Sequence, residues 1–112
     1  HNLFVAGDNP EDMLLAVRRI QELQGGFLTV RGGKILAELA LPVCGILSER
    51  GVEDTALKLK GIRESLAGLG YRHSSPIMSL GTLGLPVSPA LKLTDRGLVD
   101  VKQSAVVPLI VE

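Results

Sequence analysis

The sequence contains few of the residues from which catalytic and metal sites are usually built. Its 112 residues include one cysteine and two histidines, His1 and His73, and the two histidines lie far apart in the chain. Metal sites draw several ligands from short, recurring spacings, and neither histidine has a second ligand at the i,i+4 position. We therefore predict no metal-binding residue in this chain. A single cysteine excludes an internal disulfide and fits a reducing compartment, so we expect a cytoplasmic location.

A net charge and long apolar runs are also lacking. The formal net charge is +0, which leaves no electrostatic footprint for nucleic acid or for an anionic membrane surface. No apolar run is long enough to cross a bilayer. The first residues do not have the basic and then apolar pattern of a signal peptide. We expect neither a nucleic acid nor a membrane as partner.

Apolar residues, by contrast, are abundant although aromatic residues are few. Hydrophobic residues make up 46% of the chain and aromatic ones 3%, and the mean hydropathy is +0.30. A small domain has a large surface that is normally polar, so this excess indicates a face covered by another domain or subunit. The length suits a single domain over residues 1–112. A strand-like run begins almost at the first residue, as expected for a chain cut from a longer protein.

Helix and turn signals divide the chain clearly. Asn9 or Asp8 can cap a helix that starts at Pro10, because proline suits the first helical position. The pair Gly25-Gly26 then ends that helix. A second glycine pair suits a tight hairpin turn between two alternating segments.

The order of the expected elements favours an α+β domain with an antiparallel sheet covered by helices on one side. The elements are a strand at 3–6, a helix from residue 10 to the first glycine pair, hairpin strands at 27–30 and 35–39, a helix at 52–69, a short irregular helix or turn at 77–85, and strands at 91–93, 98–101 and 106–111. Pro108 places the last strand at an edge or a bulge.

Isolated reactive residues favour structural interpretations. Cys44 lies in an apolar segment, where a cysteine is usually a buried small hydrophobic residue. His73 follows the second helix in a loop, and a structural role is favoured for it. The serines lack a Gly-x-Ser-x-Gly elbow, and neither glycine pair has the spacing of a phosphate loop.

One polar cluster stands in an apolar region, formed by Asp95, Arg96 and Asp100. It could face a substrate or a domain interface. A turn is the favoured interpretation, because Asp95 can bond the backbone ahead of it and Gly97 supplies a positive φ. The zinc-deaminase pattern of His-x-Glu with Pro-Cys-x-x-Cys is absent. The residues alone indicate a domain without a self-contained active site.

Four segments carry a resemblance to a known family. They are His1-Asn2 before a strand and Gly7, Asn9-x-x-Asp12-Met13 leading to Gln24-Gly25-Gly26, the hairpin end Ala37-Glu38-Leu39-x-Leu41-Pro42, and above all Leu85-Pro86-Val87-x-Pro89-x-Leu91-Lys92-Leu93-Thr94-Asp95-Arg96-Gly97-Leu98-Val99-Asp100-Val101. Along essentially its whole length the chain resembles the C-terminal domain of microbial adenine deaminases, members of the amidohydrolase superfamily.

The resemblance implies a function for a larger enzyme. Such an enzyme hydrolyses adenine to hypoxanthine and ammonia in purine salvage, on a (β/α)₈ barrel whose manganese or iron activates water. None of the barrel motifs is present here. The chain is therefore expected to be inactive alone, to pack on the barrel of the same polypeptide, and to support homo-oligomer assembly or closure of the site.

Two residues are candidates for a place near the substrate. The family carries an Asp-(small residue)-His-Asn run, of which His1 and Asn2 are present here. The resemblance implies that this pair reaches the active site of the barrel. The family also has aromatic residues in a Pro-Phe-Met-x-Leu-x-Phe segment, where this chain has Pro76-Ile77-Met78-Ser79-Leu80-Gly81-Thr82. A divergent deaminase for a modified adenine therefore stays an alternative, as does a stand-alone module for oligomerisation or small-molecule binding.

Overall fold

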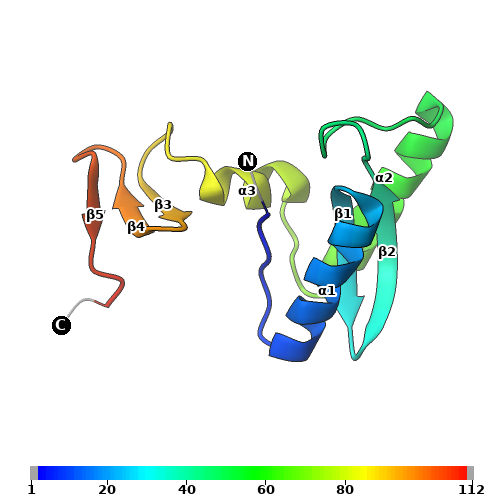
Figure 1. The fold of residues 1–112 in the computed structure, drawn as a ribbon, viewed down its shortest axis with the longest axis horizontal. Coiled ribbons are helices and arrows are strands. Elements are labelled where there is room, and N and C mark those ends of the chain that lie inside the picture. The colour runs from blue at the N-terminus through cyan, green and yellow to red at the C-terminus, as the bar shows by residue number, and fades with distance from the viewer. Residues whose placement is uncertain (1–2, 111–112) are drawn as a thin grey trace. The chain divides into compact units, whose positions relative to one another are not determined.

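The structure, a computed structural model, describes residues 3–110 and contains two compact units (Figure 1). Residues 5–72 form one unit, and residues 3–4 with 73–110 belong to the other. Helices and antiparallel strands are both present, so the predicted α+β class is confirmed. The strands are divided between two small sheets, one of two strands and one of three. The expectation of a single domain stays a prediction.

The first unit is a hairpin with a helix before it and a helix after it. Its elements are α1 (Pro10–Leu23), β1 (Gly26–Arg31), β2 (Lys34–Ala40) and α2 (Val52–Gly68). The Asn9 side chain caps α1 by accepting a hydrogen bond from the Asp12 amide at 2.9 Å, as the sequence predicts. After α1, Gln24 takes the left-handed conformation. A Cβ at Gly26 would collide with the carbonyl oxygen of Leu39, so glycine is required there.

The hairpin contains one irregularity. Thr29 is paired with Ala37, but Val30 is paired with Ile35. Leu36 is thus the extra residue of a β-bulge, which bends β2 and re-aims the side chains beyond it. The bulge lies near the turn, and the regular part of β2 follows it.

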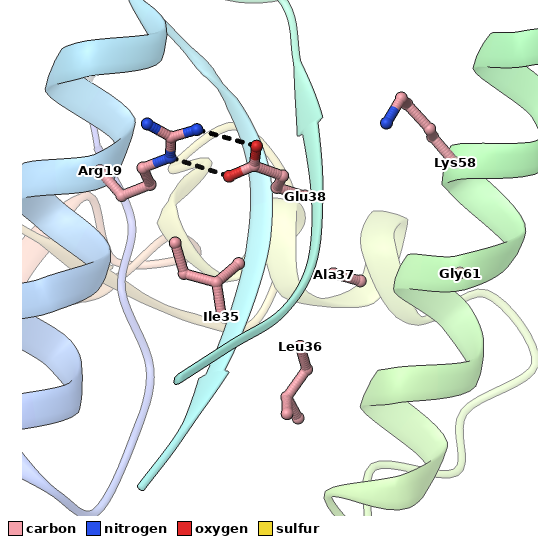
Figure 2. Close-up of a pocket in the computed structure, with 7 residues that line it drawn as sticks. All are labelled: Arg19, Ile35, Leu36, Ala37, Glu38, Lys58 and Gly61. Atoms are coloured by element: carbon pink, nitrogen blue, oxygen red, sulfur yellow. Dashed lines mark hydrogen bonds and ion pairs between the residues drawn. The ribbon is translucent and has the colours of Figure 1, made fainter. Parts of the chain in front are cut away.

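The two helices pack on opposite faces of this hairpin. Thr29 and its partner Ala37 point toward α2, where the Thr29 Oγ1 and Ser65 Oγ atoms are 2.7 Å apart. Glu38 follows Ala37 and therefore points to the other face, toward α1, as Figure 2 shows. Leu39 and Ile62 are almost completely buried, with 1% and 2% exposure. Burying each such side chain contributes about 1.5–3 kcal/mol.

The second unit holds the three-stranded sheet. Helix α3 (Pro76–Gly81) and the 3-10 helix η1 (Thr82–Gly84) precede β3 (Leu91–Thr94), β4 (Gly97–Asp100) and β5 (Ala105–Val107). The strands are antiparallel in the order β3-β4-β5. The short irregular helix predicted near 77–85 and the β3–β4 hairpin are both confirmed.

Two predicted strands differ in the structure. Leu3–Ala6 is not a strand, because no strand among the described residues pairs with it. The last strand was expected at 106–111, but β5 ends at Val107. Pro108 follows and has no N–H to donate to the ladder, which explains the early end.

Asp12 links the start of α1 to the hairpin turn. Its carboxylate accepts hydrogen bonds from the amides of Gly32 and Gly33 at 2.8 and 2.7 Å. Both glycines have positive φ, at 58° and 72°, as a two-residue turn of this kind requires. Without this carboxylate the two turn amides would have to bond to water. The two hydrogen bonds join the start of α1 to the turn and so hold the hairpin against α1.

We predict that Asp12→Ala lowers the free energy of unfolding by about 1–2 kcal/mol, because two charge-assisted hydrogen bonds are lost. Urea unfolding followed by circular dichroism measures this. Glu11→Ala is the matched control, since Glu11 is also acidic and in the first turn but is exposed. Equal effects of the two substitutions would show that charge at the helix start, and not the turn contact, matters.

Candidate functional site

An open trough of about 520 Å³ runs along the outer edge of β2. Its floor is residues 35–38 of β2, one wall is Arg19 of α1, and the other is Lys58 and Gly61 of α2. Figure 2 shows β2 lying between the two helices, with Glu38 turned toward Arg19 and Ala37 toward α2. The trough thus exists because α1 and α2 cover opposite faces of a sheet that stops at β2.

A bidentate ion pair between Arg19 and Glu38 closes one side of this trough. Arg19 donates from Nε and Nη2 to the two carboxylate oxygens of Glu38, at 2.8 and 2.9 Å. Its Nη1 donates to Glu22 at 2.8 Å. Both partners of the Arg19–Glu38 pair are about one-third exposed, at 32% each. This geometry matches the planar guanidinium to a carboxylate and fixes the distance between α1 and β2.

The ion pair changes the acidity of both groups. The hydrogen bonds from Arg19 lower the pKa of Glu38 below its ordinary value of 4.5, against an opposing effect of burial, and Lys58 lowers it further. The hydrogen bonds to Glu38 and then to Glu22 raise the pKa of Arg19. A carboxylate with a lowered pKa is a weak base near neutral pH, so Glu38 is unsuited to general-base catalysis.

The Arg19 side chain on this wall of the trough is committed to ion pairs. All the Arg19 nitrogens are already engaged with carboxylates. Within residues 3–110, no group of three or more His, Cys, Asp or Glu side chains could hold a metal ion. No helix in the same range is long and apolar enough to cross a membrane.

A second surface lies in the other unit, on one face of the three-stranded sheet. The register places Leu91 beside Asp100, and Leu98 beside Val107, on that face. The following Leu109 and Ile110 line the same hollow and are 74% and 78% exposed. We call Leu91, Leu98, Val107, Leu109 and Ile110 the C-terminal apolar face. Such a patch indicates a contact surface.

Among the residues singled out from the sequence, His73 lies in a loop and Cys44 in a turn. His1 and Asn2 lie outside the described residues. His73 accepts a hydrogen bond on Nδ1 from the Ser75 amide at 3.0 Å, which is a loop contact. The prediction that Cys44 is buried is wrong, because Cys44 is exposed. It occupies a turn with a φ of 55°, and this local conformation overrides its apolar sequence context.

The Asp95, Arg96 and Asp100 cluster is a pair of turns, as favoured from the sequence. The Thr94 hydroxyl, and not Asp95, stabilises the first turn by accepting from the Arg96 amide at 3.2 Å. Asp100 organises the next turn by accepting from the amides of Lys102 and Gln103 at 2.9 and 3.2 Å. The Asp100 contacts are local and organise the turn.

Sequence reasoning did not find the Arg19–Glu38 pair. The i,i+3 spacing of Arg19 and Glu22 is visible in the sequence, but Glu38 is 19 residues away from Arg19. The only available signal was a charged residue in an otherwise alternating strand. Which helix would face that charge depends on the packing of α1 against the hairpin.

Comparison with known proteins identifies the class of this α+β domain. Residues 1–105 match the family described as the adenine deaminase C-terminal domain, and the chain belongs to this family. No solved structure matches the chain.

Relatives with assigned names agree with this family. The chain is 51% identical over 99% of its length to adenine deaminase 2 of Shouchella clausii, and 48% identical over 97% of its length to adenine deaminase of Oleidesulfovibrio alaskensis. The chain is also 48% identical over 98% of its length to an adenine deaminase of Staphylothermus marinus. The chain spans only 18–19% of the length of these relatives.

The lowered pKa of Glu38 predicts a pH-dependent contribution to stability. Because the folded-state pKa lies below the unfolded one, this contribution is present above the unfolded pKa and is lost as the pH falls through the folded pKa. Glu38→Gln should therefore destabilise the chain near neutral pH and match the unchanged chain in acid. Urea unfolding across this pH range measures the difference.

Glu64→Gln is the control for this prediction. Glu64 pairs with Lys60 at 3.7 Å, and both side chains are about two-thirds exposed or more, at 66% and 70%. Exposed pairs of this kind contribute little. A Glu38→Gln effect that does not change with pH would contradict the assigned role of the ion pair.

Proposed function

We propose that this chain is the non-catalytic C-terminal domain of a cytoplasmic enzyme that hydrolyses adenine to hypoxanthine and ammonia in purine salvage. The observation that carries the proposal is the family match over residues 1–105, together with relatives about five times longer that are named adenine deaminases. The parent polypeptide, meaning the longer chain of which this domain is a part, supplies an amidohydrolase barrel. The chemistry takes place on that barrel.

The exposed apolar residues support a packing role. Only Leu39, Leu41 and Ile62 are buried hydrophobic residues in the described part of the chain. The C-terminal apolar face, in contrast, is half-exposed or more at Leu91, Leu109 and Ile110. Covering such a face removes apolar area from water at about 25 cal/mol per Å². We propose that the barrel domain covers it, and that this contact supports assembly of a homo-oligomer or closure of the active site.

The proposal places His1 and Asn2 nearest to the substrate. The family resemblance supports this position, since the pair belongs to the family's Asp-(small residue)-His-Asn run. A manganese or iron ion in the barrel would supply a hydroxide near neutral pH. The described residues of this chain offer no ligand set for such an ion, so its ligands are assigned to the barrel.

The substrate has a specific alternative. Residues 76–82 form α3 and the start of η1, and they contain no aromatic residue where the family has two. Aromatic side chains stack on purines, so their loss favours a divergent site for a modified adenine. A parent polypeptide that released ammonia or an amine from N6-substituted adenine faster than from adenine would support this alternative.

The activity prediction compares the 112-residue chain with the parent polypeptide. Ammonia release from adenine is measured for both in the presence of manganese. We expect turnover by the parent polypeptide only, because the metal and its ligands belong to the barrel. Turnover by the 112-residue chain would refute the assignment of catalysis to the barrel, and inactivity of both on all adenines tested would refute the proposed function.

A surface substitution in the parent polypeptide tests the packing role. We predict that Leu109→Glu lowers the melting temperature of the parent polypeptide, because a carboxylate would be placed in a covered apolar contact. Val87→Glu is the matched control, since Val87 is 75% exposed in the same unit and lies outside the C-terminal apolar face. Equal effects of the two substitutions would argue against this face as the contact.

A further inference from the structure

The sheet of the first unit is incomplete at the β2 edge. Its two strands are the only members of this sheet in the described chain, so β2 has one side without a strand partner. The Leu41 amide donates to the Gly25 carbonyl at 3.0 Å, which directs the Leu41 N–H toward β1. Successive backbone N–H groups of a strand point to alternate sides of it. The N–H groups of Glu38 and Ala40 therefore point away from β1, toward the trough.

The trough has the form of a slot for one extended segment. Its floor is the outer edge of β2, and its walls are α1 and α2, so a third strand would continue the sheet between the two helical layers. A two-stranded hairpin is marginal by itself, and three strands are the usual minimum for a stable sheet. An unpaired edge of seven residues, with Leu36 47% exposed, is also a liability that proteins normally cover.

Gly61 is independent evidence for an occupant. It lies in the interior of α2, where glycine weakens a helix. A Cβ at Gly61 would meet nothing within 4 Å, so no other part of the described chain requires a glycine there. Gly61 nevertheless lines the trough. A glycine in such a place is explained when another backbone approaches it closely.

We infer that a strand of the parent polypeptide, from the part that precedes this domain, pairs with the outer edge of β2 and fills the trough. This inference rests on the proposed function, since the occupant belongs to the same longer polypeptide. Relatives supply about four-fifths of their length outside the matched region, which is ample for one strand. A second copy of this chain fits less well, because it would bring two more helices against the helical walls.

Hydrogen exchange of single amides tests the pairing directly. In the parent polypeptide, the outward amides of Glu38 and Ala40 should exchange as slowly as the inward amides of Leu39 and Leu41. In the 112-residue chain, the outward amides should exchange at least ~100-fold faster than the inward ones. Fast exchange of the outward amides in the parent polypeptide would overturn the inference, whether or not the shorter chain folds.

Slow exchange of the outward amides in the 112-residue chain would bear on which segment pairs with β2. If protection increases with protein concentration, the occupant is a second copy, and the inferred strand of the parent polypeptide is wrong. Ammonia release from adenine is measured on the same parent preparation. Turnover with unprotected outward amides would overturn this inference and leave the proposed function intact.

One substitution of Gly61 is made in each protein. In the 112-residue chain, Gly61→Ala should raise the melting temperature by about 4 °C or more, since alanine favours the helix and meets no neighbour. In the parent polypeptide, Gly61→Leu should lower the melting temperature and speed exchange at Glu38 and Ala40, because the side chain would occupy the slot.

Gly68 supplies the matched control for Gly61→Leu. It is the last residue of α2, is exposed, and also has nothing within 4 Å of a built Cβ, but it does not line the trough. Gly68→Leu should leave exchange at Glu38 and Ala40 in the parent polypeptide unchanged. If Gly61→Leu and Gly68→Leu behave alike there, no backbone lies against Gly61 and the inference is wrong.

Discussion

The first unit depends on the packing of α1 and α2 against opposite faces of one hairpin. A two-stranded ribbon cannot bury its own side chains, so both faces must be covered from outside. On one face, Leu39 and Ile62 form the buried centre, and the Thr29–Ser65 hydrogen bond satisfies the polar group beside them. On the other face, the Arg19–Glu38 pair provides a polar contact at the margin. The same sandwich leaves the β2 edge as a walled trough.

The hydroxyl contact in this packing has a definite direction. Ser65 Oγ donates to the Ile62 carbonyl at 2.8 Å, within its own helix. Because a hydroxyl carries one proton, Thr29 is then the donor to Ser65. Thr29 is only 6% exposed and would lose its bond if α2 moved away. Burial of this polar group therefore makes the position of α2 on the hairpin specific as well as favourable.

The small core and the large exposed apolar area of this chain have the same explanation. A chain with this composition buries few side chains fully within itself, whereas a domain of a larger enzyme can complete its burial against its neighbours. The C-terminal apolar face and the β2 trough are two places in the described part of the chain that such neighbours can cover. The C-terminal apolar face lacks a covering layer, and the β2 edge lacks a neighbouring strand. Both needs agree with a family whose named members are about five times longer than this chain.

The sequence by itself determined the local elements, because their signals are local. Asn9 and Pro10 start α1, Gly32-Gly33 turns the hairpin, and Pro108 stops β5, although the left-handed end of α1 is Gln24 and not a glycine. The sequence also carried the resemblance to the adenine deaminase C-terminal domain. Only the tertiary structure decided which helix faces Glu38, that Leu3–Ala6 has no strand partner among the described residues, and that a trough exists. Those features depend on contacts between residues distant in the sequence, and no pattern of neighbouring residues encodes them.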